Sequence, residues 1–249
     1  MTASSASPSS VFDLAYGDVH LWLCSLTTAM NMPRHVLSVE EQKRYQRRPD
    51  AAAARVWLRH QLSHYGPKSP AEWTFCRGKH GKPDLQGAEA QLQFNLSHSG
   101  DWIVLALSAQ AAVGVDVQWH DPGRSVAPIA RRYFQASEAQ ALLNDSGINR
   151  TEFYHYWSMK EAWAKARGAA LPGALGSAGF ALSGARLECT ALHTPGESVW
   201  LMAIPGYSLA LSTLTSPAKL RARMWHETGR FEPFSPTFTA ATEGAQIAA

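Results

Sequence analysis

Apolar and polar residues alternate along this chain in two ways, with the period of a strand in some stretches and of a helix in others. The stretch DVHLWLCSL (18–26) alternates as a β-strand does. Residues 92–118 predict a strand, a polar turn, a second strand, a short turn and a third strand. Farther along, VWLMAIPG and YSLALSTL (199–214) predict a closing hairpin.

Helical patterns lie between these strands, over residues 37–48, 50–66, 131–145 and 151–168. Ser38 precedes the first pattern and Glu41 follows three residues later, which predicts a capping box. In the last pattern Lys165 and Arg167 suit the negative end of the helix dipole. Gly168 is placed to take the left-handed position that ends this helix.

A helix followed by strands occurs once before residue 110 and once after it. This order predicts an α+β fold of two similar α/β lobes related by pseudo-twofold symmetry, with the active site in the cleft between them. We expect a flexible N-terminus (1–10), an N-terminal lobe (11–110), a C-terminal lobe (111–230) and a flexible tail (231–249).

Composition narrows the class of protein. The chain has 249 residues, 45% of them hydrophobic and 17% charged, which indicates a globular protein without extensive disorder. Its three cysteines are far apart and lack the spacing of a zinc site, and no signal peptide or membrane span is visible, so we expect a cytoplasmic protein. A formal charge of +3 favours an anionic small molecule or an acidic protein partner over nucleic acid or a membrane.

Two segments carry candidate metal ligands. In VGVDVQ the strand period puts Asp116 and Gln118 on the face opposite the valines. In the last predicted helix, residues four apart share a face, so Trp157, Glu161 and Lys165 form one stripe and Lys160 points about 100° away from Glu161. The hard oxygen donors of 116, 118 and 161 are those that magnesium prefers. A turn-capping Asp and a surface Glu–Lys pair remain the alternatives.

Basic residues gather in three places, and each could equally be solvated surface. The polar turn at 97–100 offers hydroxyls, an imidazole and backbone N–H groups to an anion. The loop RGKHGKPD is basic and rich in turn residues, and two arginines of the second predicted helix share a face. The residues concerned are Ser97 and His98; Arg77, Lys79 and Lys82; and the basic residues of KRYQRR (43–48), among them Arg44, with Arg55 and Arg59.

The segments GKPD, FNLSHSGDWIVLAL, GVDVQ and WSMKEAWAKARGAAL stand in an order and spacing that resemble the 4′-phosphopantetheinyl transferases. The resemblance is to the longer, two-lobed type that activates surfactin synthetase, and it spans residues 37–183. It implies transfer of phosphopantetheine from coenzyme A to a serine of an apo acyl or peptidyl carrier protein, with release of 3′,5′-ADP. It also implies a magnesium-dependent enzyme, which we expect to be a monomer.

Carried over residue by residue, the resemblance implies roles for the candidate residues. Asp116 and Glu161 would hold magnesium on the pyrophosphate, with residue 118 as a third ligand position, and Lys165 would contact the phosphate under attack. Either Glu161 or Lys160 could take part in proton transfer. The residues that would bind coenzyme A, with the 3′-phosphate as target of the basic cluster, are Arg44, Arg55, Lys82, Ser97, His98 and Lys165.

The chain departs from the family pattern at Gln118, where a Glu is common. This leaves the third metal ligand open. Two other interpretations stay open with it. One is a weak or inactive relative that still binds coenzyme A or a carrier domain. The other is a metal-dependent nuclease that uses Asp116, Glu161 and Lys165, which would require a more basic surface than +3.

Overall fold

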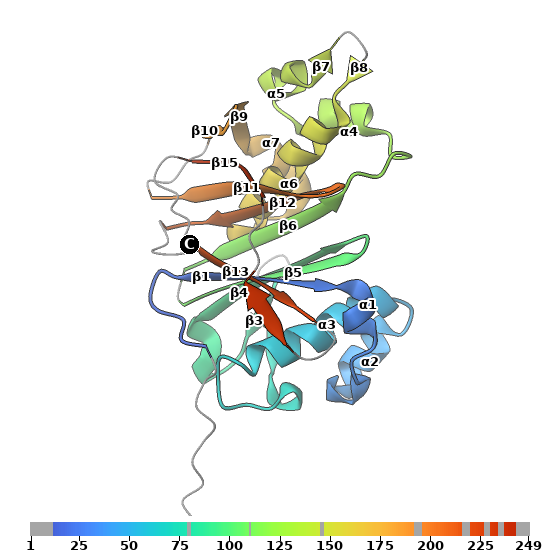
Figure 1. The fold of residues 1–249 in the computed structure, drawn as a ribbon, viewed down its shortest axis with the longest axis vertical. Coiled ribbons are helices and arrows are strands. Elements are labelled where there is room, and N and C mark those ends of the chain that lie inside the picture. The colour runs from blue at the N-terminus through green and yellow to red at the C-terminus, as the bar shows by residue number, and fades with distance from the viewer. Residues whose placement is uncertain are drawn as a thin grey trace, which may run out of the picture.

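The computed structural model describes residues 12–78, 81–109, 111–144, 147–191, 196–215, 220–226, 230–233 and 237–242. It shows two lobes stacked on each other, each with a β-sheet and a set of helices on the outer side of the molecule (Figure 1). The predicted α+β class with two sheet-containing lobes is therefore confirmed. The predicted N-terminal segment 1–10 lies outside the described residues.

Both sheets are mainly antiparallel. The first sheet contains, in spatial order, β14 (Phe231–Pro233), β13 (Leu220–Trp225), β1 (Val19–Ser25), β5 (Trp102–Ala109) and β4 (Leu92–Ser99). The second contains β6 (Val113–Trp119), β12 (Tyr207–Thr213), β11 (Ser198–Ile204), β15 (Thr237–Ala241), β10 (Arg186–Ala191) and β9 (Gly179–Ser183). Two small hairpins pair β2 (Phe75–Arg77) with β3 (Pro83–Leu85) and β7 (Leu143–Asn144) with β8 (Gly147–Ile148).

The two halves of the chain repeat one topology. In the first half the neighbours are β1, β5 and β4, and in the second half they are β6, β12 and β11, with antiparallel pairing throughout. In each half the first strand in the chain leads to helices, and the next two of these strands form a hairpin. This repeated order is the one expected for lobes related by a pseudo-twofold axis.

The end of the chain does not follow the expected division into lobes. β13 pairs in parallel with β1, so residues 220–225 belong to the sheet of the first lobe and not to the second. Residues 231–233 extend that sheet and 237–241 pair with β11, so this part of the expected flexible tail is ordered in strands. The physical reason is burial along an open strand edge. Leu220, for example, is 2% exposed in the core between the sheets.

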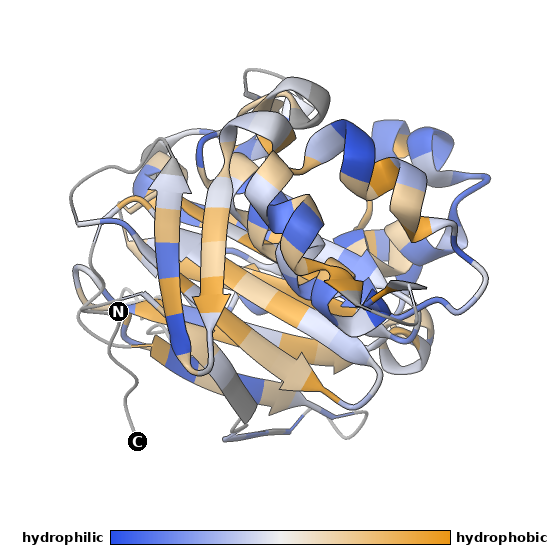
Figure 2. Ribbon diagram, turned by 90° about the horizontal axis from the view of Figure 1, so that it is seen from above, coloured by the Kyte–Doolittle hydropathy of each residue, from blue (hydrophilic) through white to orange (hydrophobic). Residues whose placement is uncertain are grey.

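The core between the sheets explains why the lobes stack. Alternate residues of each strand point to the partner sheet, as period two requires. The contributing side chains include Val19, Leu21 and Leu23 of β1, Val113, Val115 and Val117 of β6, and Leu209 and Leu211 of β12. Hydrophobic residues prevail along the strands, whereas the helices carry both hydrophobic and hydrophilic residues (Figure 2).

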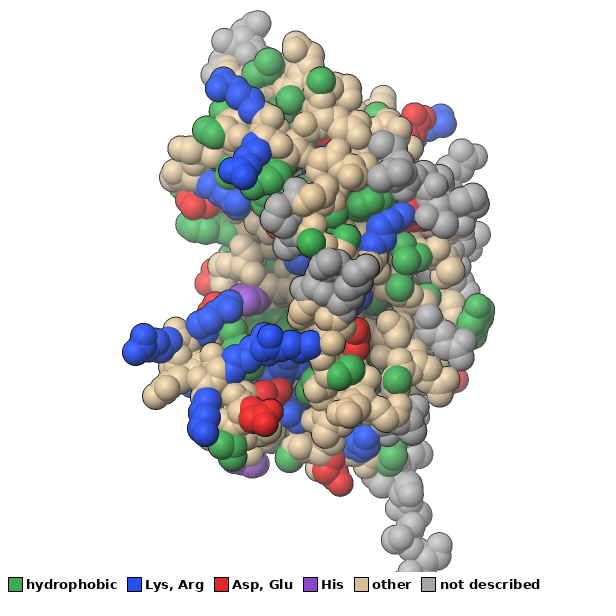
Figure 3. All heavy atoms as spheres, turned by 180° about the vertical axis from the view of Figure 1, so that it is seen from behind, with side chains coloured by type: hydrophobic (Ala, Val, Ile, Leu, Met, Phe, Trp, Pro, Cys, Tyr) green, Lys and Arg blue, Asp and Glu red, His purple; other side chains and the backbone are tan. Residues whose placement is uncertain are grey.

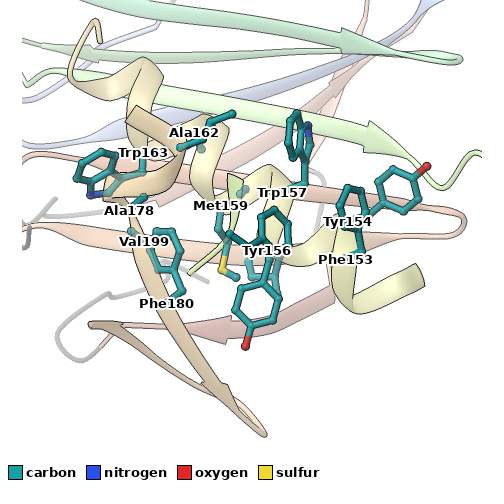
Figure 4. Close-up of a cluster of buried hydrophobic side chains, with 14 of the residues drawn as sticks. Phe153, Tyr154, Tyr156, Trp157, Met159, Ala162, Trp163, Ala178, Phe180 and Val199 are labelled. Atoms are coloured by element: carbon teal, nitrogen blue, oxygen red, sulfur yellow. The ribbon is translucent and has the colours of Figure 1, made fainter. Parts of the chain in front are cut away.

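One long helix covers the outer face of each sheet. These are α3 (Pro49–Leu62) on the first sheet and α6 (Arg150–Ala166) on the second. Apolar side chains of α6, from Phe153 to Trp163, pack against Phe180 and Val199 (Figure 4). The shorter helices are α1 (Leu26–Met30), α2 (Val39–Tyr45), α4 (Val126–Tyr133), α5 (Ala136–Ala141) and α7 (Leu171–Ser177).

Helix ends follow the local signals closely. The capping box of Ser38 and Glu41 is present at the start of α2, and Gly168 has the predicted positive φ of 58° after α6. The single helix predicted over 131–145 is wrong, because Gln135 is extended and starts a new capping box with Glu138. The chain therefore breaks there into α4 and α5.

Side chains of β4 join the two sheets where they meet. Along β4, every second residue presents an oxygen to a backbone N–H of β6, the first strand of the other sheet. The three acceptors and their donors are Asn95 Oδ1 with Val115 N (2.8 Å), Ser97 Oγ with Val117 N (3.3 Å) and Ser99 Oγ with Trp119 N (3.0 Å). We refer to these three bonds as the β4–β6 ladder. It fixes the position of β6 relative to the first lobe.

Candidate active site

The stripe predicted on α6 meets β6 at close range. Gly114 on β6 makes this approach possible, because a Cβ at this position would lie 2.0 Å from the Ala162 carbonyl oxygen and 2.3 Å from the Ala166 nitrogen. Two residues farther along the same face, Asp116 lies opposite the last turns of α6. A strand carboxylate and the helix stripe are thereby brought into one site.

Asp116 lies at the centre of this site and is only 1% exposed. Its Oδ1 accepts hydrogen bonds from Ser97 Oγ at 2.8 Å and from Lys165 Nζ at 2.5 Å. Its Oδ2 accepts from Gln118 Nε2 at 2.8 Å. The Lys165 ammonium also lies 3.4 Å from Glu161 Oε2, so one cation faces both carboxylates.

The charges in this cluster shift the pKa values of two groups. Burial and the nearby Asp116 carboxylate raise the pKa of Glu161, while Lys165 and Arg124 oppose that rise. Burial alone would lower the pKa of Lys165, but the carboxylates of Asp116 and Glu161 outweigh it and raise the pKa. Lys165 therefore stays charged at neutral pH, and Glu161 accepts a proton more readily than an ordinary glutamate.

The donor set fits a hard divalent cation. Asp116 and Glu161 already share a cation, the Lys165 ammonium. In the described ranges no group of three or more His, Cys, Asp or Glu residues could hold a metal, so other ligands would have to be the Gln118 amide, water or substrate oxygens. Magnesium accepts such a set, since it is usually bound by one or two carboxylates and retains waters.

Lys160 does not belong to this cluster, contrary to the proton-transfer role considered from the sequence. Its side chain is fully buried on another side of α6, where Nζ lies 2.6 Å from Glu138 Oε2 and donates to the backbone carbonyls of Leu175 and Ala178. Burial lowers the pKa of Lys160, and the Glu138 carboxylate opposes this. The ion pair ties α6 to α5, and the two carbonyl bonds tie it to the end of α7 inside the second lobe.

A basic cavity of about 880 Å³ lies beside the first lobe. It is bounded by α2, α3, the β2–β3 hairpin and β4. Figure 3 shows Lys and Arg side chains gathered on the side where α2 and α3 lie, next to the waist between the lobes. The charged residues that line it include Arg44, Arg48, Arg55, Arg59, Arg77 and His98. Such a cavity suits a large anionic ligand.

The cationic side chains of this cavity differ in how far nearby carboxylates neutralise their charge. Glu41 accepts from Arg59 Nη2 at 2.6 Å and lies 3.3 Å from Arg55 Nε, so it partly neutralises both guanidinium groups. Arg55 stacks 4.2 Å from the centre of the Phe75 ring, and its buried Nη1 has no hydrogen-bond partner among the residues that the structure describes. His98 Nε2 lies 3.0 Å from Asp50 Oδ2. An anion could satisfy the free atom of Arg55.

Two residues assigned to coenzyme A by resemblance point elsewhere. Lys82 Nζ donates to the carbonyls of Val113 and Lys165 at 3.1 Å each, so it connects the β2–β3 hairpin to the second lobe. Ser97 is buried, and its hydroxyl contacts Asp116, Val117 N and Lys165 rather than the basic cavity. Lys79 lies outside the described residues.

Residues 26–110 match the sequence profile described as 4′-phosphopantetheinyl transferase, N-terminal, and residues 112–210 match that of the 4′-phosphopantetheinyl transferase superfamily. The 4′-phosphopantetheinyl transferase Sfp of Bacillus subtilis is 31% identical over 163 residues, which cover 63% of this chain and 70% of Sfp. The chain belongs to the 4′-phosphopantetheinyl transferase superfamily.

Other members of the superfamily give a consistent picture. The slr0495 protein of Synechocystis is 34% identical over 165 residues, or 62% of this chain and 67% of that protein. The transferase HetI of Nostoc is 29% identical over 205 residues, or 77% and 81% of the two chains. The family resemblance drawn from four short motifs is thus confirmed. Within the described ranges, no helix combines the length and apolarity needed to cross a bilayer.

Several residues of this site were not singled out from the sequence. Asp50 contacts His98, Phe75 lines the cavity, and the charge of Arg124 acts on Glu161. Asp50 lies in the first turn of α3, where an acidic residue is also typical of a solvated helix end. Phe75 is a single aromatic residue in a short strand and gave no signal at all.

Proposed function

We propose that this protein transfers 4′-phosphopantetheine from coenzyme A to a serine of an apo acyl or peptidyl carrier protein. The observation that carries the proposal is the Lys165 ammonium facing two carboxylates, Asp116 at 2.5 Å and Glu161 at 3.4 Å, close to a large basic cavity. A ligand with a charged nucleotide end and a diphosphate matches both parts. We expect a monomer, because one chain supplies both parts, and we expect it to act in the cytoplasm.

The basic cavity would bind the nucleotide end of coenzyme A. Arg44, Arg55 and His98 line it, and they supply guanidinium and imidazole donors for the 3′-phosphate. Phe75 offers a flat apolar surface beside Arg55. The remainder of coenzyme A would extend from this cavity toward Asp116 and Glu161.

At the other end, the serine oxygen of the carrier would attack the phosphorus that bears pantetheine. The bond from that phosphorus to the leaving oxygen breaks, and 3′,5′-ADP departs. The serine proton passes to the Glu161 carboxylate, directly or through water, since this carboxylate is the nearest available base. Lys165 stays protonated and neutralises charge on a nonbridging oxygen.

Magnesium would be held by Asp116 and Glu161, with Gln118 at the edge of the site. When bound, the ion supplies positive charge to the diphosphate oxygens. The Gln118 amide donates to Asp116 Oδ2, so its part is to orient that carboxylate. Ser97 and the backbone of β6 hold Asp116 from the other side.

The transfer reaction itself is the first expected result. Purified protein with magnesium and coenzyme A should add phosphopantetheine to an apo carrier, which raises the intact mass of the carrier by that group. A panel of fatty-acid, polyketide and peptide carriers tests which pathway the enzyme serves. Unchanged masses across the panel would refute the proposal. Binding of coenzyme A without transfer would then identify an inactive relative, and magnesium-dependent cleavage of nucleic acid would identify a nuclease.

Replacement of cavity residues should affect the affinity for coenzyme A more than the chemical step. Contacts with a remote phosphate are equally strong in the ground state and the transition state, so Arg44→Ala and His98→Ala should raise KM for coenzyme A and leave kcat unchanged. Steady-state kinetics with dephospho-coenzyme A, which lacks the 3′-phosphate, serves as the control. Equal losses on both substrates would show that these residues do not contact the 3′-phosphate.

A further inference from the structure

The loop that follows β6, residues 120–125, is held rigidly beside the active site. Arg150 Nη2, at the start of α6, donates to the carbonyls of Asp121 at 2.6 Å and Arg124 at 2.8 Å. The Tyr154 hydroxyl donates to the Asp121 carbonyl at 3.0 Å, and Gly123 N donates to Asp121 Oδ1 at 2.8 Å. The backbone of Arg124 is thus fixed relative to α6.

The side chain of Arg124 turns toward the catalytic stripe of α6. Its guanidinium carbon lies 5.2 Å from the centre of the Trp157 ring, within the range of a cation–π contact. Trp157 is the first residue of the stripe that continues with Glu161 and Lys165. The charge of Arg124 also acts on Glu161, where it opposes the rise in pKa that burial and Asp116 cause.

The guanidinium N–H groups of Arg124 are available to a ligand. In the part of the chain that the structure describes, it forms no hydrogen bond or ion pair, whereas Arg150 is engaged with two carbonyls and Arg55 with Glu41. It is also only half-buried, so a ligand can reach it. A planar fork of N–H donors on a fixed backbone is suited to binding phosphate oxygens.

We propose that Arg124 is a further catalytic residue, which donates hydrogen bonds to the nonbridging oxygens of the coenzyme A diphosphate during transfer. This inference rests on the proposed function. Lys165 approaches the phosphate from the end of the stripe, and Arg124 approaches it from the Trp157 end, so the two cations flank Glu161. Arg124 keeps all its protons, and its charge offsets the negative charge that shifts to the leaving oxygen.

An acidic side chain of the carrier protein would be the other anion within reach of the half-buried Arg124. The position beside Glu161 favours the diphosphate, because that carboxylate lies at the reacting centre and not at the rim. The neighbouring Arg132 on α4 provides the contrast. It also stacks on an aromatic ring, 5.2 Å from the centre of Tyr133, but it is exposed and that ring does not belong to the stripe of Trp157, Glu161 and Lys165.

The test compares Arg124→Ala and Arg124→Lys with Arg132→Ala in two assays. In steady-state transfer, Arg124→Ala should lower kcat/KM for coenzyme A by about 10²-fold, as the loss of one transition-state donor does, and Arg124→Lys should restore part of it. Arg132→Ala should leave that value unchanged. In calorimetry without carrier, Arg124→Ala should weaken binding of coenzyme A more than binding of 3′,5′-ADP, which lacks the diphosphate.

Three results would overturn the inference. The first is an unchanged rate and unchanged affinity for coenzyme A in Arg124→Ala. The second is a defect confined to KM for the carrier, which would assign Arg124 to the protein partner. The third is an equal loss of affinity for coenzyme A and 3′,5′-ADP. If the wild-type protein transfers nothing, the proposed function fails, and the calorimetric comparison still decides whether Arg124 binds the diphosphate.

Discussion

Asp116→Asn should reduce phosphopantetheine transfer by about 10³-fold or more while the fold is retained. The reason is that the Lys165 ammonium and a bound divalent ion both lose the negative charge of Asp116. The Lys165 ammonium loses its nearest carboxylate at 2.5 Å, and a bound divalent ion loses one of its two anionic ligands. The asparagine keeps the volume of the aspartate and an oxygen for the Ser97 hydroxyl, so packing around β6 should persist. Intact-mass kinetics on an apo carrier measures the loss, and circular dichroism checks the fold.

Gln118 supplies the matched control for this prediction. Gln118→Ala removes a neutral amide that water can replace, so it should cost much less activity than Asp116→Asn or Glu161→Ala. Gln118→Glu adds a third charge and should lower the magnesium concentration for half-maximal rate. An equal loss in Gln118→Ala and Asp116→Asn, or a magnesium requirement that Gln118→Glu leaves unchanged, would contradict a peripheral role for residue 118.

Lys160→Met should destabilise the protein by about 3–5 kcal/mol, because it leaves a carboxylate buried without its cation. Glu138 is 1% exposed and lies 2.6 Å from the Lys160 ammonium. The methionine fills a similar volume, so the expected cost comes from the charge and not from a cavity. Urea denaturation followed by tryptophan fluorescence measures the free energy of unfolding.

A second substitution separates this structural role from a catalytic one. Glu138→Gln in the Lys160→Met background removes the stranded charge and keeps an acceptor for Phe180 N, so it should restore much of the stability. Exposed Lys43→Met should change stability by only about 0.5 kcal/mol. A Lys160→Met variant with wild-type stability and a greatly reduced kcat would instead indicate that Lys160 takes part in proton transfer.

The sequence was sufficient to predict the central cluster, because its geometry depends on two short periods. A spacing of four on a helix aligns Glu161 with Lys165, and alternation on a strand puts Asp116 on the face opposite the valines. That these two faces meet was indicated by the family resemblance and not by either period. The close approach itself depends on Gly114, which these periods do not reveal.

The roles of Lys160, Lys82 and Ser97 could not be predicted in the same way. Lys160 is next to Glu161 in the chain, yet its partner, Glu138, lies on another helix. Lys82 and Ser97 each form their contacts across the lobe boundary, with Val113 and Asp116. A motif records residue type and spacing, whereas such partners are decided by tertiary packing.

Long-range strand pairing was equally hidden from the sequence. β13 lies parallel to β1 although about 200 residues separate them in the chain, and nothing local in LRARMW indicates that partner. The strand hairpins of 92–109 and 198–213 were predicted correctly because their partners are neighbours in sequence. The expected lobe boundaries failed where the chain returns to a distant strand.

The β4–β6 ladder also bears on aggregation. β6 is the edge strand of its sheet, and its outward N–H groups would form a template for pairing with another chain if they were bare. Asn95, Ser97 and Ser99 cover that edge with side-chain oxygens instead of a further strand. A fragment that begins at residue 111 would lose all three acceptors and expose Val113, Val115 and Val117 on the same strand. Such a fragment would tend to self-associate through β6, so the first half of the chain protects the second from amyloid-like strand addition.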